Sequence, residues 1–129
     1  MIICDSSSLI LLAKINRLSI VNSLYGKVLI PKAVYDETIV KGKEERYSDA
    51  FLIEKQIGEL IMLKDLDKTH MAKAERLKAV VGKGEAEAIA LCEQEKQKTL
   101  LTDDLDSMRI AKEHKIKCRT SLGLLYEAL

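Results

Sequence analysis

Several kinds of residue are scarce in this sequence, and each scarcity argues against a class of protein or site. The 129 residues include no tryptophan, one phenylalanine, four tyrosines, one proline, two histidines and three cysteines. With so few aromatic rings, stacking on nucleic-acid bases cannot supply much binding energy. Two histidines argue against a His/Cys zinc site. The cysteines are odd in number and lie in apolar segments, which predicts buried thiols in a reducing cytoplasm: Cys4, Cys92 and Cys118.

An excess of charge of one sign is also absent. Lysine and arginine together number 21 and aspartate and glutamate 20, so the formal net charge is +1. This balance excludes a polybasic protein that binds nucleic acid through net charge alone. It still allows an acidic pocket beside a basic rim, so the positions of the acidic residues become the main question.

Long apolar runs are missing as well. The longest, residues 9–13, is too short to span a membrane, and the N-terminal residues lack the pattern of a secretory signal. We therefore expect a cytoplasmic protein with no membrane association. A hydrophobic content of 47% excludes a disordered chain, and the length predicts one domain over residues 1–129.

Short β-like runs alternate with helical patterns along the chain. The predicted strands cover residues 1–4, 28–30, 61–63, 99–102 and 116–118. The predicted helices cover residues 6–14, 17–24, 31–40, 49–60, 69–81, 85–95, 107–113 and 121–129, and residues 41–46 read as a charged loop. This alternation predicts a three-layer α/β fold, with a small, mostly parallel sheet flanked by helices.

Acidic residues follow two of the predicted strands directly. Asp5 ends the first, and Asp103 and Asp104 end the fourth. Ligands of parallel sheets bind at the carboxyl ends of the strands, so these acids are candidates for a shared site. The alternative is a structural role, because an aspartate at a strand-to-helix junction often caps the helix. The serines after Asp5 supply other candidate caps.

Two helices add further carboxylates. Glu37 shares a helix face with apolar residues, although it could instead point to solvent, and spacing alone does not separate it well from Asp36. Glu85 lies on the apolar stripe of its helix but in the first turn, where a carboxylate also interacts favourably with the helix dipole. Glu87 shares a different face and is the weaker candidate.

Several carboxylates in one cleft repel each other unless a cation neutralises them. Oxygen ligands favour Mg²⁺ or Mn²⁺, and the chemistry that follows is metal-assisted hydrolysis of a phosphodiester. The Gly82-Lys83-Gly84 segment is not a phosphate-binding loop, because the closing Lys-Ser/Thr pair is absent. This absence counts against a nucleotide-binding or phosphotransfer domain.

Five blocks, in this order, resemble those of PIN-domain nucleases, in the form used by a prokaryotic, largely uncharacterised subgroup. They are residues 2–10 (IICDSSSLI), 28–37 (VLIPKAVYDE), 82–89 (GKGEAEAI), 100–104 (LLTDD) and 120–123 (TSLG). The resemblance implies a Mg²⁺- or Mn²⁺-dependent ribonuclease acting on RNA. It implies catalytic metal ligands at Asp5, Glu37, Glu85 and Asp104.

The resemblance carries further expectations. Asp103 is also commonly acidic in this subgroup, so it is a possible additional ligand. Ser7 and Thr102 would be hydroxyls that orient the carboxylates or a bound water. Many relatives are toxins of toxin–antitoxin pairs and form homodimers, which implies an antitoxin partner and a second copy of the chain. The competing hypothesis is a catalytically silent PIN-like module that binds or regulates a partner.

Basic residues form two clusters, one at Lys41, Lys43 and Arg46 and one at Lys112, Lys115, Lys117 and Arg119. Solvated surface is the default interpretation of such clusters. A cluster that borders the acidic cleft would instead hold the RNA backbone and make binding depend on salt.

Overall fold

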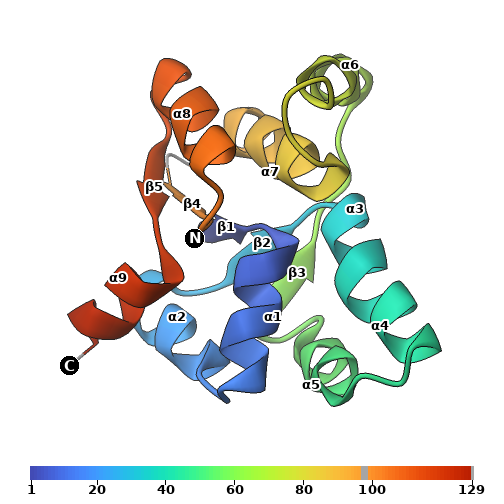
Figure 1. Cartoon of the computed structure of the whole chain (residues 1–129), viewed down its shortest axis with the longest axis vertical. Coiled ribbons are helices and arrows are strands. Elements are labelled where there is room, and N and C mark those ends of the chain that lie inside the picture. Colours follow the sequence, from blue (N-terminus) through green and yellow to red (C-terminus); the bar gives the residue numbers. More distant parts are fainter. Residues whose placement is uncertain (97–98, 129) are drawn as a thin grey trace.

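A computed structural model describes residues 1–96 and 99–128 and shows a central sheet between layers of helices (Figure 1). The strands lie in the order β3-β2-β1-β4-β5, and every pairing among the described residues is parallel. Their bounds are β1 Ile2–Cys4, β2 Val28–Ile30, β3 Ile61–Leu63, β4 Thr99–Leu101 and β5 Lys117–Arg119. The predicted α/β fold with a small parallel sheet is confirmed.

Helices cover both faces of this sheet (Figure 1). Their bounds are α1 Ser6–Lys14, α2 Leu18–Tyr25, α3 Lys32–Tyr35, η1 Asp36–Val40, α4 Lys41–Glu44, α5 Ser48–Gln56, α6 Lys68–Leu77, α7 Lys83–Gln94, α8 Leu105–Glu113 and α9 Ser121–Glu127, where η1 is a π-helical turn. The last predicted helix extends to Leu129, which lies outside the described residues. None of the described helices is long and apolar enough to cross a membrane.

Two hydrophobic cores form because strand residues alternate between the faces. Ile2 and Cys4 of β1 pack with α1, α2, α5 and α9, whereas Ile3 packs with α7 and α8. These three side chains are fully buried. Each large apolar side chain buried in this way contributes about 1.5–3 kcal/mol to the stability of the fold. Cys4 and Cys92 are buried free thiols, as predicted, and Cys118 is partly buried.

The register of β1 and β4 brings their carboxyl ends together. Cys4 pairs with Leu101, and the Asp5 amide donates a hydrogen bond to the Leu101 carbonyl at 3.2 Å. The segments that follow both strands therefore leave the sheet side by side. This edge is where the predicted acidic site lies.

The predicted charged loop over residues 41–46 is wrong in its first four positions. Lys41–Glu44 forms α4, which continues α3 through η1 as one helical rod. Lysine and glutamate are good helix formers, and the buried Gly42 lies against α5. A β-carbon at Gly42 would lie 2.7 Å from the β-carbon of Ala50, so only glycine permits this approach. Packing on α5 therefore accounts for a helix that local charge does not suggest.

The predicted helix over residues 49–60 ends earlier, at Gln56. Gly58 has a φ of 89°, a left-handed conformation that glycine adopts without strain. This conformation turns the chain so that the Gly58 amide donates to the Ile61 carbonyl at 2.8 Å. The turn leads directly into β3.

Candidate metal centre

Asp5 lies at the centre of the acidic edge, and its side chain is fully buried. One carboxylate oxygen accepts the Ser8 amide hydrogen at 3.1 Å, which makes Asp5 the N-cap of α1. The other accepts the Thr102 hydroxyl at 2.5 Å. Of the candidate caps, Asp5 rather than one of the serines after it therefore caps this helix. Asp5 therefore caps the helix and also lies in the candidate site.

The electrostatic environment of Asp5 disfavours its charged form. Burial raises the pKa of the Asp5 carboxyl, and the nearby charge of Asp103 raises it further. Hydrogen bonds from Thr102 and Ser8 lower this pKa and offset part of the effect of burial. A neighbouring cation would therefore stabilise the charged form of this buried carboxylate.

Asp103 and Asp104 are adjacent in sequence but have different partners. Asp104 caps α8: one carboxylate oxygen accepts both the amide and the hydroxyl of Ser107, each at 2.8 Å. Asp103 accepts the amide of Ser121 at 2.8 Å, the hydroxyl of Ser121 at 2.7 Å and the hydroxyl of Ser8 at 3.4 Å. Asp103 thereby joins β4 to α9 and α1. Within the described residues Asp104 keeps one oxygen without a hydrogen bond, whereas both oxygens of Asp103 are occupied.

Glu37 reaches the site from η1. Its side chain is exposed, and one carboxylate oxygen accepts the Ser6 hydroxyl at 2.5 Å. Gly84 makes room for it, since a β-carbon there would lie 2.1 Å from that oxygen. π-helical turns frequently occur at functional sites. The sequence contained no sign of this turn or of the contact with Ser6.

Glu85 interacts electrostatically with the other three predicted ligands. It lies in the first turn of α7 and is partly buried. Burial raises the pKa of its carboxyl most, and the charges of Asp5, Asp104 and Glu37 raise it further. The fold thus brings the predicted acids into one electrostatic field. In the described part of the chain, however, no three of these groups already converge at metal-coordinating distance.

Of the two predicted hydroxyls, Thr102 contacts the acids and Ser7 does not. Thr102 is buried between two of them, because it donates to Asp5 and accepts the Asp104 amide at 3.1 Å. Ser7 is exposed, and within residues 1–96 and 99–128 no hydrogen bond joins it to a carboxylate. Its neighbours Ser6 and Ser8 make those bonds instead.

Glu87 has a structural role that the sequence did not show. It is buried on α7, and its carboxylate accepts the Ala33 amide hydrogen at 3.0 Å. Ala33 lies in the first turn of α3, where amides have no partner within the helix. The N-cap of α3 is Pro31, whose side chain has no acceptor. Glu87 therefore fixes the helical rod that carries Glu37.

Replacing Glu87 with alanine is expected to lower the free energy of unfolding by about 1–3 kcal/mol, because the Ala33 amide loses its partner. Glu87→Gln keeps a carbonyl acceptor and should cost much less. Chemical denaturation of both variants measures the difference. Equal stability of the alanine and glutamine variants would contradict this role.

Comparison with known proteins agrees with this geometry. A family model described as a PIN domain matches residues 1–129, the whole of the chain. No curated protein matches the sequence. PIN domains are generally nucleases, so the match supports the interpretation of this protein as a hydrolase. The resemblance inferred from the five sequence blocks is thereby confirmed, and this chain belongs to the PIN-domain family.

Proposed function

We propose that this protein is a Mg²⁺- or Mn²⁺-dependent endoribonuclease that hydrolyses phosphodiester bonds in RNA. The observation that carries the proposal is the placement of Asp5 and Asp104 after the paired carboxyl ends of β1 and β4, with Glu85 near enough that the charges of Asp5, Asp104 and Glu37 repel its own. Such mutual repulsion is relieved when a cation binds among the carboxylates. Their donor atoms are all oxygens, which suits Mg²⁺ and Mn²⁺.

The proposed ligands are Asp5, Glu37, Glu85 and Asp104, with Asp103 as an additional one. When bound, the ion would supply an activated water and stabilise charge on the leaving oxygen. Thr102 orients Asp5 through its hydroxyl, and Ser6 holds Glu37 beside Gly84. Ser7, exposed on the same turn as Ser6, is proposed to orient a water at the site.

The remaining proposals concern partners and location. We propose a protein antitoxin and a second copy of this chain as partners, supported by family membership and by the apolar side chains exposed on α8 and α9, Leu105, Leu122 and Tyr126. A cytoplasmic location is supported by the three free cysteines.

Incubation of labelled RNA with the purified protein tests the catalytic proposal. We expect cleavage with Mn²⁺ and no cleavage with EDTA. A catalytically silent module remains the second candidate, because no three acids of the described residues already lie at metal-coordinating distance. Calorimetric titration with Mn²⁺, read together with the cleavage assay, separates the two. Binding of Mn²⁺ together with cleavage supports the nuclease, and the absence of both supports the silent module.

Gly84→Ala is expected to lower the affinity for Mn²⁺ by about 10–100-fold, the usual effect of displacing a group that positions a ligand. The added methyl group would occupy the place of the Glu37 carboxylate. Stability should hold or rise, because alanine favours a helix over glycine by up to about 1 kcal/mol. Calorimetry with Mn²⁺ and thermal unfolding measure the two effects.

Gly26→Ala is the matched control. Gly26 has a φ of 79° and open space around it, so alanine should cost about 1–3 kcal/mol of stability through backbone strain alone and leave Mn²⁺ affinity unchanged. Wild-type Mn²⁺ affinity in Gly84→Ala would refute the positioning of Glu37 by this glycine.

A further inference from the structure

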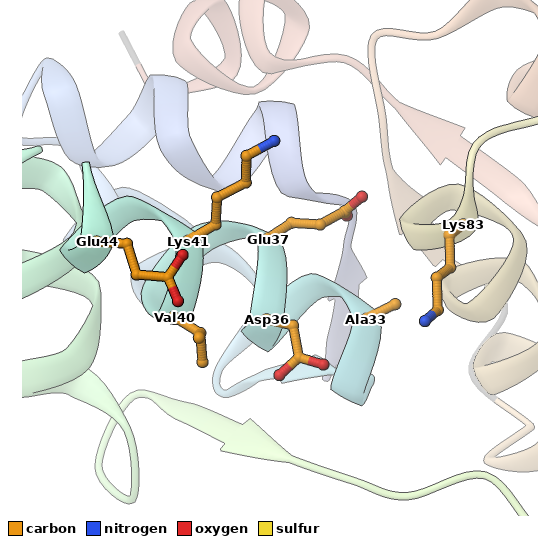
Figure 2. Close-up of a pocket in the computed structure, with 7 residues that line it drawn as sticks. All are labelled: Ala33, Asp36, Glu37, Val40, Lys41, Glu44 and Lys83. Carbon is orange, nitrogen blue, oxygen red and sulfur yellow. The ribbon is translucent and has the colours of Figure 1, made fainter.

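A groove of about 530 Å³ lies beside the acidic cluster, between the rod formed by α3, η1 and α4 and the start of α7. Glu37 forms part of its wall, and Ala33 and Val40 contribute apolar surface. In Figure 2, Glu37 lies between Lys41, on α4, and Lys83, at the start of α7. The groove therefore leads directly to one of the proposed metal ligands.

The lysines near this groove fall into two groups. Lys32 forms an ion pair with Asp36 at 3.4 Å, and Lys43 forms one with Glu54 at 2.8 Å and also lies over the ring of Phe51. By contrast, among the described residues neither Lys41 nor Lys83 forms an ion pair, and Lys83 acts on Glu75 only at longer range. Of these four lysines, the two that line the groove are thus the two without an ion pair in the described part of the chain.

We propose that Lys41 and Lys83 bind backbone phosphates of an RNA strand that runs through this groove to the acidic cluster. The inference rests on the proposed nuclease function, and it assigns the residues that hold the substrate. Each lysine lies close in sequence to a proposed ligand, Lys41 four residues after Glu37 and Lys83 two residues before Glu85. A phosphate beside the scissile one would interact with these two ammonium groups, because Lys32 and Lys43 of the rod are already paired with carboxylates.

The acidic residues of the groove sharpen this assignment. Asp36 is paired with Lys32, and the Glu37 carboxylate accepts the Ser6 hydroxyl and keeps the same charge in every variant compared below. Glu44 is exposed and forms no ion pair among the described residues, and Figure 2 shows the side chain of Lys41 extending away from it. Glu44 should therefore repel a strand in the groove. Its neutralisation should strengthen binding where neutralisation of the lysines weakens it.

Fluorescence anisotropy with a short labelled oligouridylate, in EDTA to prevent cleavage, tests the proposal with Lys41→Gln, Lys83→Gln, Glu44→Gln and Lys43→Gln. Each lost phosphate contact should reduce the slope of log affinity against log salt by about 0.7, which corresponds to roughly fivefold weaker binding at about 0.1 M salt. We expect this loss for Lys41→Gln and for Lys83→Gln, and tighter binding for Glu44→Gln. Lys43→Gln is the matched control, because it removes the same charge from the same helix at a position paired with α5.

The outcomes separate the two proposals. If Lys41→Gln and Lys83→Gln bind with the affinity and salt slope of Lys43→Gln, the groove assignment is wrong, whatever the wild-type protein cleaves. If they weaken binding but the wild-type protein does not cleave RNA with Mn²⁺, the groove assignment stands and the nuclease proposal fails. Lysine-dependent binding of an oligoglutamate peptide without binding of RNA would overturn the assignment in favour of an acidic protein segment.

Discussion

Replacing Asp5 with asparagine is expected to lower the rate of Mn²⁺-dependent RNA cleavage by at least about a hundredfold, because even residues that only support a metal ligand are worth about 10–100-fold. Asp5 is the most buried of the proposed ligands and lies between the ends of β1 and β4. The measurement is the initial rate of cleavage of a labelled RNA at fixed Mn²⁺. A wild-type rate in this variant would exclude Asp5 from the site.

The fold should survive this change. Asparagine is as good an N-cap as aspartate, so its carbonyl oxygen can accept the Ser8 amide. Its amide nitrogen can donate to the hydroxyl oxygen of Thr102, where the carboxylate now accepts. Both buried partners keep a hydrogen bond, which is why asparagine is preferred to alanine for this test.

Asp106→Asn provides the matched control for cleavage. Asp106 lies in the first turn of α8, close in sequence to Asp104, but its side chain is exposed and pairs with Arg109 at 3.6 Å. The same chemical change at this position should leave the cleavage rate close to that of the wild type. A comparable loss in both variants would indicate a general effect of charge rather than a metal ligand.

Saturating Mn²⁺ is expected to raise the free energy of unfolding by about 2.7 kcal/mol at a concentration one hundred times the Kd. For a domain of this size, that is roughly a 10 °C rise in Tm. The stabilisation should vanish in Asp5→Asn. Thermal unfolding followed by circular dichroism, with Mn²⁺ and with EDTA, measures it without any need for RNA or for catalysis. Equal melting temperatures with and without Mn²⁺ would argue for the silent module.

Two contributions to the free energy of unfolding should depend on pH with opposite signs: that of Asp5 in the metal-free protein and that of bound Mn²⁺. Because the pKa of Asp5 is raised, the folded protein retains a proton that the unfolded chain releases between the ordinary and the raised pKa. The contribution of Asp5 to the unfolding free energy of the metal-free protein therefore falls as pH rises through that interval. Protons compete with the ion for Asp5 and Glu85, so stabilisation by Mn²⁺ should shrink as pH falls through their raised pKa values. The two stability curves should converge in acid.

Features set by local sequence could be predicted. The first four strands showed as short, largely apolar runs, whereas β5 reads Lys-Cys-Arg. An acid directly after a strand lies at the carboxyl end of the sheet wherever the strands are parallel. Asp5 and Asp104 could be placed by this rule without knowing which strands pair. The register of Cys4 with Leu101 then brings them to the same edge.

Features that depend on distant partners could not be predicted. Glu87 meets an amide 54 positions away in sequence, and Ser6 meets Glu37 at a separation of 31. Ser121 holds Asp103 across 18 positions. Nothing in the residue types themselves indicates these pairings, since serine and glutamate are mostly found on solvated surfaces. The helical state of Lys41–Glu44 likewise depends on contact with α5, which no local pattern records.

The π-helical turn η1 allows the rod formed by α3, η1 and α4 to contact α7 at one end and α5 at the other. Upstream of it, Ala33 must face the Glu87 carboxylate, and downstream of it Gly42 must face Ala50. An uninterrupted α-helix has a fixed rotation of about 100° per residue, so it could not be phased independently for both contacts. The wider π-helical turn changes the rotation between the two ends of the rod, and Glu37 lies within this turn. Loss of one residue from η1 would therefore misalign either the acidic cluster or the contact with α5, while leaving the composition of the rod almost unchanged.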